Sequence, residues 1–373
     1  MARANRVLVS DGIYHVTSRI VNREMWLHDP RLKDEIVSWM YGIAAFSGVE
    51  LLAWCIMDNH FHILVHVPKV PVRYRLDPDR DPPAYALGMR PSMCRPPLWR
   101  PDEPSGDCPP GKEFPQTEIR PPTGFMLPDD EMLERLRHLY GDENRIEALR
   151  VAWEHMRRVG NDAAVDAVKE RYCRRMYNLS QFVKALKERI ARTINSRLKH
   201  VGHVFEGRFH SGLVEKIGDV EKLVALYIDG NPYRARLVSG EKVYRWSSFG
   251  RACDEDGIAL SCRKVYEHLH SRPWTEVKAK IFALFGDSSP RRCVEGESTF
   301  GFPQNSDDQL KVPPSELIRT RVTALSDGAF IGKSMAFGHA IASSLAQNFP
   351  CPSFRTLVWL ERNVKWQNDR SVA

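Results

Sequence analysis

The sequence predicts an α+β fold, in which a ferredoxin-like (RRM-like) antiparallel sheet carries its helices on one face. A strand, a helix and a second strand are expected within residues 11–67, and this order opens a ferredoxin-like fold. A long basic helix and further strand-like residues follow after residue 179. Of the 25 prolines, 16 lie between Pro68 and Pro128, which predicts an irregular insertion between the two halves.

The first elements are predicted from residue spacing. Apolar and polar residues alternate in GIYHVTSRI, which predicts a strand. The segment PRLKDEIVSWMYGIAAFSG is expected to be a helix, because its apolar residues recur at helical spacing and Gly48 can end it. The next segment, VELLAWCIMDNHFHILVHVP, is long and apolar and is expected to form one central strand.

Three amphipathic helices are expected after the insertion, and Ser180 is the predicted N-cap of the basic helix QFVKALKERIARTINSRLK. The remaining boundaries follow from composition. We divide the chain into the first half of the sheet domain (1–68), a proline-rich insertion (69–128), inserted helices (129–178), the second half of the sheet domain (179–250), a weakly patterned linker (251–312) and a helical C-terminal region (313–373).

Composition restricts the class of protein. The 54 Lys and Arg residues exceed the 47 Asp and Glu residues, and the net charge of +7 favours a polyanionic partner. A run of about 18 apolar residues is missing, so no membrane span is expected. The first residues resemble no secretory leader, and the eight cysteines form no CxxC pair. We therefore expect a cytoplasmic protein without a structural zinc site or a disulfide framework.

The sharpest feature for chemistry is the pair His60 and His62 in DNHFHILV. Residues two apart in a strand share one face, so both imidazoles are expected on the same side of the sheet. Two neutral imidazoles held together form part of a site for a divalent metal. The same spacing also fits two polar residues on a half-exposed strand, so spacing alone leaves both interpretations open.

Several motifs, in order, resemble one family. The segments GIYHVTSR and MDNHFHILV are followed by LKERIARTINSRLKHVGHVFEGRFHSGLVE, YIDGNPYRARLV and YRWSSFG. Together they resemble the REP-associated tyrosine transposases, a branch of the single-tyrosine HUH (His-hydrophobic-His) transposases. The resemblance covers about 11–67 and 179–250.

The resemblance implies cleavage and rejoining of DNA at single-stranded or hairpin-forming ends. In such enzymes a histidine pair and a third polar ligand hold Mg²⁺ or Mn²⁺, and a helix-borne tyrosine attacks phosphorus to form a 5′-phosphotyrosine. His60 and His62 match the metal ligands of the family. Asn195 could supply the third ligand, or it could be an amide on the helix surface.

The sequence departs from the family pattern as we align it. The tyrosine is expected on the helix 181–199, at positions that Arg189 and Ile190 occupy here, and Ile190 fits the apolar stripe of that helix. Tyr177 lies upstream and is the replacement nucleophile we consider, with helix packing as its other interpretation.

Basic residues form the second group of candidate functional residues. Near the proposed site they would bind phosphates, although charge runs often form a solvated helix face. The predicted DNA-binding residues are Lys187, Arg189, Arg192, Arg197 and Arg208.

Two functions from different classes follow. The first is a transposase-like protein that cleaves and rejoins single-stranded or hairpin DNA with a divalent metal, using either a displaced tyrosine or an activated water. The second is a catalytically inactive DNA-binding protein that retains the transposase scaffold. An RNA-binding protein that uses the same sheet is a more distant third.

Overall fold

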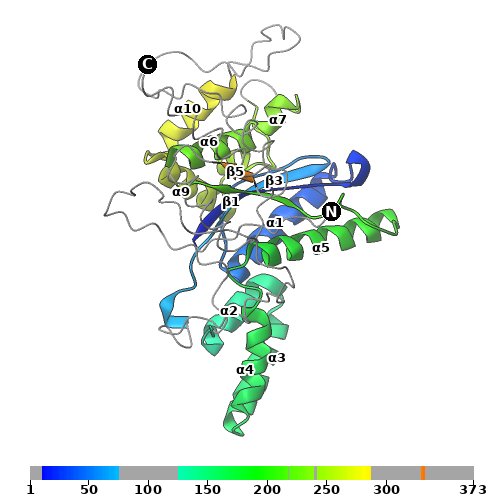
Figure 1. Ribbon diagram of the computed structural model, residues 1–373, viewed down its shortest axis with the longest axis vertical. Coiled ribbons are helices and arrows are strands. Elements are labelled where there is room, and N and C mark those ends of the chain that lie inside the picture. The colour runs from blue at the N-terminus through cyan, green and yellow to red at the C-terminus, as the bar shows by residue number, and fades with distance from the viewer. Residues whose placement is uncertain (1–10, 75–124, 217, 239–241, 287–328, 332–373) are drawn as a thin grey trace, which may run out of the picture.

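The computed structural model describes residues 11–74, 125–216, 218–238, 242–286 and 329–331. Most of the predicted proline-rich insertion and of the C-terminal region lies outside these residues. None of the helices in the described ranges combines the length and the hydrophobicity that a membrane-spanning helix needs. The chain forms a central sheet with helices on both sides and a helical arm that projects away from the sheet (Figure 1).

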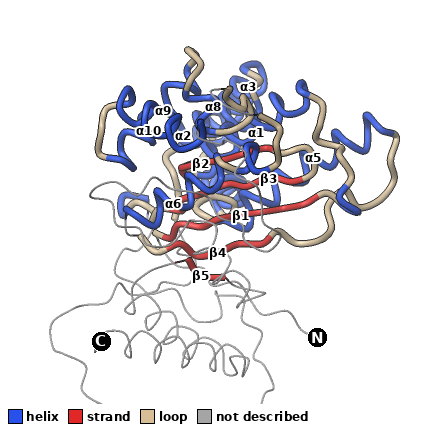
Figure 2. The backbone as a smooth tube through the Cα atoms, turned by 90° about the horizontal axis from the view of Figure 1, so that it is seen from above, coloured by secondary structure: helices blue, strands red, loops and turns tan. Residues whose placement is uncertain are grey.

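The sheet confirms the ferredoxin-like prediction. Its strands are β1 (Gly12–Arg19), β2 (Glu50–Ile56), β3 (His60–Val67), β4 (His210–Val214) and β5 (Ala329–Ile331). Their order is β2-β3-β1-β4-β5, as Figure 2 shows from above. The first four strands pair antiparallel, and β5 lies parallel to β4. The central strands β1 and β3 are therefore paired on both sides.

The segment expected to be one central strand is instead a hairpin. Strands β2 and β3 pair with each other, and the Met57 amide donates to the His60 carbonyl at 2.8 Å. Asp58 and Asn59 occupy the turn, and residues of this kind favour turns because their short polar side chains bond to nearby backbone. The apolar residues on both sides of this turn made the segment resemble one continuous strand.

Two helices cover one face of the sheet, as predicted. Helix α1 (Pro30–Ser47) begins after Asp29, whose side chain accepts a hydrogen bond from the Arg31 amide, and it ends at Gly48 with φ of 69°. Helix α5 (Leu179–Leu198) is capped by Asn178, not by the predicted Ser180. The core on this face combines residues from both helices and both central strands: Val16, Phe61, Ile63, Ile36, Met40, Leu186 and Ile190.

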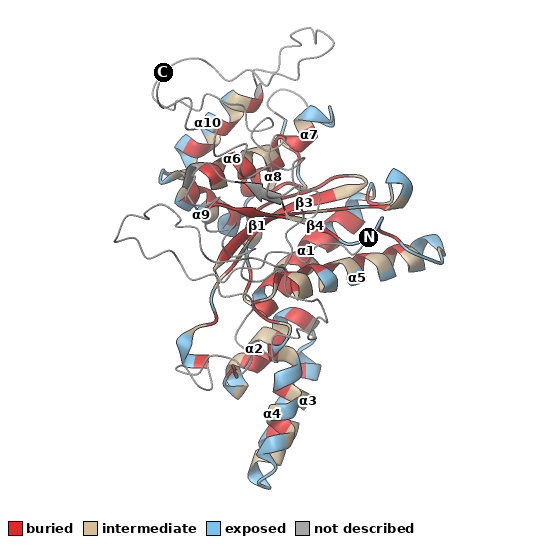
Figure 3. Cartoon of the chain, viewed as in Figure 1, coloured by how far each residue is buried: buried red, intermediate tan, exposed pale blue. Residues whose placement is uncertain are grey.

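The opposite face is also covered, which the sequence did not lead us to expect. Helix α6 (Gly218–Asp229) packs there, and Val224 and Ile228 join Ile13 and Leu64 of the sheet in a second core cluster. The short helices α7 (Asn231–Arg234) and α8 (Ser248–Ala252) follow. Figure 3 shows the buried residues concentrated along the sheet and the helices that flank it.

Two further groups of helices complete the described chain. The predicted inserted helices are α2 (Asp129–Tyr140), α3 (Glu143–Arg158) and α4 (Asp162–Cys173), and they form the projecting arm in Figure 1. Helices α9 (Gly257–His270) and α10 (Trp274–Gly286) lie where the sequence showed only weak patterning. They share a third core cluster built around Phe249 and Tyr266.

Candidate active site

The two predicted histidines share one face of the sheet. His60 begins β3 directly after the turn, and it lies opposite Arg19 of β1, while His62 lies opposite Thr17. The ring centroids of His60 and His62 are 5.0 Å apart. The strand spacing thus brings the two imidazoles together, as predicted.

A third imidazole, which the sequence did not single out, completes the cluster. His15 lies on β1, and its Nε2 is 3.0 Å from Nδ1 of His62. The two rings are nearly parallel, at 6°, with centroids 5.3 Å apart. Both side chains are buried, each with 7% of its surface exposed.

All three imidazoles are held neutral near pH 7. Burial lowers the pKa of His15 to about 4. Burial, reinforced by the cations Arg19 and Arg234, lowers the pKa of His60 to about 4. Burial and the neighbouring imidazoles hold the pKa of His62 well below its usual range. A neutral imidazole keeps a free lone pair, which is the form that binds metals.

The hydrogen bonds of the pair leave one nitrogen of each ring available. Nδ1 of His60 is 2.7 Å from Oδ1 of Asn59, so Nδ1 carries the proton and Nε2 carries the lone pair. His62 uses its Nδ1 toward His15. Metal-binding histidines commonly fix their second nitrogen in this way. The pair therefore fits a divalent cation as two of its ligands.

A third side-chain ligand is not apparent. Among the residues that the structure describes, no group of three or more His, Cys, Asp or Glu side chains is arranged to hold a metal ion. Asn195, the predicted third ligand, lies on α5, which packs on the other face of the sheet from the histidines. Its Nδ2 donates to the Gly202 carbonyl at 3.4 Å, and its Oδ1 is buried without a partner in the described chain.

The tyrosine that meets the histidines is Tyr227, on α6. Its ring packs edge-on against His15 and His62, with centroids 5.8 Å and 5.9 Å away. The guanidinium of Arg234 lies 4.3 Å from the centre of the Tyr227 ring. Asn231 links these residues, since its amide donates to the Tyr227 carbonyl at 2.9 Å and its Oδ1 accepts from Arg234.

Tyr177, the predicted replacement nucleophile, lies elsewhere. Its side chain is buried in the core shared with α1 and α5, on the face of the sheet opposite the histidines. Its hydroxyl accepts a hydrogen bond from Arg135 at 2.8 Å, and its ring packs against Phe125. The structure therefore does not bring Tyr177 together with the histidines; the residue joins the helical arm to the sheet domain, which fits its other interpretation as a packing residue.

The predicted DNA-binding residues divide into two groups. Arg197 forms ion pairs with Asp29 at 3.1 Å and Glu35 at 2.5 Å. Arg189 donates to the Leu139 carbonyl and lies over Trp39, and Lys187 donates to the Gly207 carbonyl. These three residues tie α5 to neighbouring elements.

The other two predicted cations are more open to solvent. Arg192 is 81% exposed and lies 3.6 Å from Glu188. Arg208 is exposed and makes no hydrogen bond or ion pair with any residue that the structure describes. Arg19, which the sequence reasoning missed, is likewise exposed, next to His60 in the sheet.

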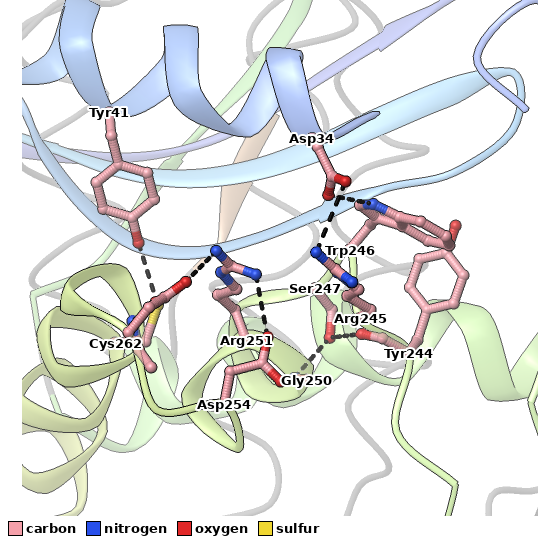
Figure 4. A network of polar contacts seen from close by, with 12 residues as sticks. Asp34, Tyr41, Tyr244, Arg245, Trp246, Ser247, Gly250, Arg251, Asp254 and Cys262 are labelled. Carbon is pink, nitrogen blue, oxygen red and sulfur yellow. Dashed lines mark hydrogen bonds and ion pairs between the residues drawn. The ribbon is translucent and has the colours of Figure 1, made fainter. Parts of the chain in front are cut away.

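The segment that contains YRWSSFG supports the turn before His60. Trp246 Nε1 and Arg245 both bond to the carboxylate of Asp34 on α1, as Figure 4 shows. The hydroxyl of Tyr244 donates to the Ile56 carbonyl at 2.9 Å. The buried amine of Lys33 donates to that hydroxyl and to Asp58 in the turn. This motif therefore has a positioning role.

Comparison with known proteins agrees with the resemblance. Residues 8–74 match the family described as "Transposase IS200 like". Among solved structures, the chain is similar to a REP-associated tyrosine transposase bound to a REP hairpin, with 12% sequence identity and a TM-score of 0.32. That match covers 68% of this chain and 85% of the other. No curated protein matches the chain significantly. The part of the chain that supplies His15, His60 and His62 is therefore the part that is similar to the IS200-like transposase family.

Proposed function

We propose that this protein cleaves and rejoins single-stranded or hairpin DNA through a covalent tyrosine intermediate. The observation that carries the proposal is the packing of Tyr227 against His62, on the sheet face where the histidines gather. A nucleophile and a metal-binding pair are needed on the same side of the scissile phosphate. The family match over residues 8–74 supports a transposase reaction.

His60 and His62 would hold Mg²⁺ or Mn²⁺ through their Nε2 atoms. When bound, such an ion polarises the phosphate and offsets the charge that develops during phosphoryl transfer. The two imidazoles are neutral, so they contribute no charge against that of the ion. The remaining ligands would be water, phosphate oxygens or an amide oxygen, since the described residues supply no third acidic or histidine ligand at the pair.

Tyr227 is the nucleophile in this proposal. Its phenol oxygen attacks the phosphorus, the phenol proton leaves to solvent, and a 5′-phosphotyrosine forms. The bond from phosphorus to O3′ breaks, and O3′ takes up a proton as the free 3′-OH. Attack by a 3′-OH on the phosphotyrosine reverses these bonds and rejoins the strand. Because the phosphoester is conserved throughout, no external energy source is required.

The cations near the histidine cluster supply a surface for the DNA backbone. Arg19 lies opposite His60, and the Glu206 amide donates to the Arg19 carbonyl, which brings the segment that carries Arg208 alongside. Arg234 lies over the ring of Tyr227. We therefore infer that DNA contacts Arg19, Arg208 and Arg234, and that α5 contributes Arg192 at most.

The test is incubation of the full chain with end-labelled hairpin DNA and Mn²⁺, followed by denaturing electrophoresis. A protein–DNA adduct that resists denaturation supports the proposal. Cleavage without an adduct would instead indicate attack by a metal-activated water. Binding without either product would favour the catalytically inactive scaffold.

A further inference from the structure

The contact between His15 and His62 has a chemical consequence. In a neutral imidazole one ring nitrogen carries a proton and the other carries a lone pair. A hydrogen bond between Nε2 of His15 and Nδ1 of His62, at 3.0 Å, therefore has two arrangements. In the first, His62 donates from Nδ1 and keeps its lone pair on Nε2. In the second, His15 donates from Nε2, and His62 must carry its own proton on Nε2.

Only the first arrangement fits metal binding. A proton on Nε2 of His62 would face the cation and remove the lone pair that should bind it. The proton position of His60 is already fixed, because the Asn59 oxygen accepts a hydrogen bond from its Nδ1.

We propose that His15 is a positioning residue that accepts a hydrogen bond from Nδ1 of His62, so that Nε2 of His62 presents its lone pair to a divalent cation. This inference rests on the proposed metal site at His60 and His62. It gives His15 a role in the site, which the proposed metal binding by His60 and His62 does not by itself provide.

The surroundings of His15 fix the orientation of its ring. Strand β1 is paired on both sides, and His15 lies between Leu64 of β3 and Gly212 of β4. The Tyr227 ring packs edge-on against both imidazoles, at 85° and 88°. The backbone ladder and this ring together fix the His15 ring in the plane of the His62 ring. A hydrogen bond in that plane has near-optimal direction.

The proposed hydrogen-bond acceptor, the imidazole of His15, carries no charge. Metal-binding histidines often donate to a carboxylate, which adds negative charge behind the metal. An imidazole acceptor orients the ligand without adding charge. An ion held by His60 and His62 would then keep its full positive charge for the phosphate.

The test uses two replacements of His15. His15→Gln retains an amide oxygen that can accept near the position of Nε2, whereas His15→Leu retains bulk without an acceptor. Mn²⁺ affinity is measured without DNA, by electron paramagnetic resonance of free Mn²⁺. We expect His15→Leu to weaken Mn²⁺ binding about 10–100-fold and His15→Gln to restore most of the loss. His66→Leu, on the neighbouring strand β3 at the end away from His60, is the matched control and should leave Mn²⁺ affinity unchanged.

The tautomer itself is read on the wild-type chain, which removes any doubt from misfolded variants. Long-range ¹H–¹⁵N correlation of histidine rings, assigned by single replacements, should show the proton of His62 on Nδ1. A proton on Nε2 of His62, or unchanged Mn²⁺ affinity in folded His15→Leu, would overturn the inference. Failure of the proposed function looks different: Mn²⁺ would not bind the wild type, or His60→Ala would leave its affinity unchanged.

Discussion

The ring of Tyr227 meets the ring of His62 edge to face, with centroids 5.9 Å apart and planes at 88°. One residue comes from α6 and the other from β3, so the contact exists only because α6 covers the sheet face that carries the histidines. The apolar residues Val224 and Ile228 hold α6 there. The proposed chemistry thus depends on the packing of a helix as much as on the histidine motif.

Replacement of the metal-binding histidines should separate metal binding from DNA binding. His60→Ala and His62→Ala should each weaken Mn²⁺ binding by more than about 100-fold, since even outer-shell partners are worth about 10–100-fold. Affinity for hairpin DNA should change little, because neutral imidazoles attract phosphates weakly. Calorimetry with Mn²⁺ and fluorescence anisotropy with labelled hairpin measure the two effects. Equal loss in both assays would contradict the metal assignment.

Replacing cations near the histidine cluster should weaken DNA binding more than replacing Arg197 on α5. Arg19→Ala and Arg234→Ala should each weaken DNA binding and lower the slope of log affinity against log salt by about 0.7–0.9, the value for one phosphate contact. Arg197→Ala is the matched control, because Arg197 is engaged with Asp29 and Glu35. Its loss should leave that slope unchanged. A larger effect from Arg197 than from Arg234 would place the DNA on the opposite face.

A buried carboxyl at the end of α6 should make the stability of the fold depend on pH. Asp229 is 1% exposed and accepts from Ser248, Tyr266 and the Phe249 amide, and burial raises its pKa to about 7. The unfolded chain releases this proton near pH 4, so the folded state binds more protons between these values. Stability from this group is therefore lost as pH rises from about 4 to 7.

Asp229→Asn isolates that effect, because all other groups titrate in both proteins. The unfolding free energy of the wild type, relative to Asp229→Asn, should fall by roughly 1–3 kcal/mol between pH 5 and pH 8. Urea denaturation at several pH values measures it. A constant difference across this range would show that Asp229 is ionised throughout.

Local patterns predicted a large part of the fold. The two-residue spacing placed His60 and His62 on one face, because strand periodicity is set by the backbone alone. The apolar stripe on α5 correctly marked Ile190 as core, with none of its surface exposed. The apolar run around Asp58 and Asn59 was misinterpreted as one strand, because hydrophobicity outweighed the turn signal of these two residues.

Contacts between distant elements could not be predicted in this way. Tyr227 stands in a motif that was noticed, YIDGNPYRARLV, yet nothing local shows that α6 returns to the histidine face. The charges of α5 gave no sign of their partners, and Arg197 meets carboxylates of the α1 region. His15 became important only through its cross-strand hydrogen bond. In each case the missing information was tertiary.

The identity of the tyrosine joined to DNA tests the central claim most directly. The adduct formed with hairpin DNA and Mn²⁺ is digested with nuclease and trypsin, and the modified peptide is located by mass spectrometry. We predict the nucleotide on Tyr227, with Tyr227→Phe giving no adduct and Tyr177→Phe giving as much as the wild type. A nucleotide on any other residue, or an undiminished adduct from Tyr227→Phe, would contradict the proposed site.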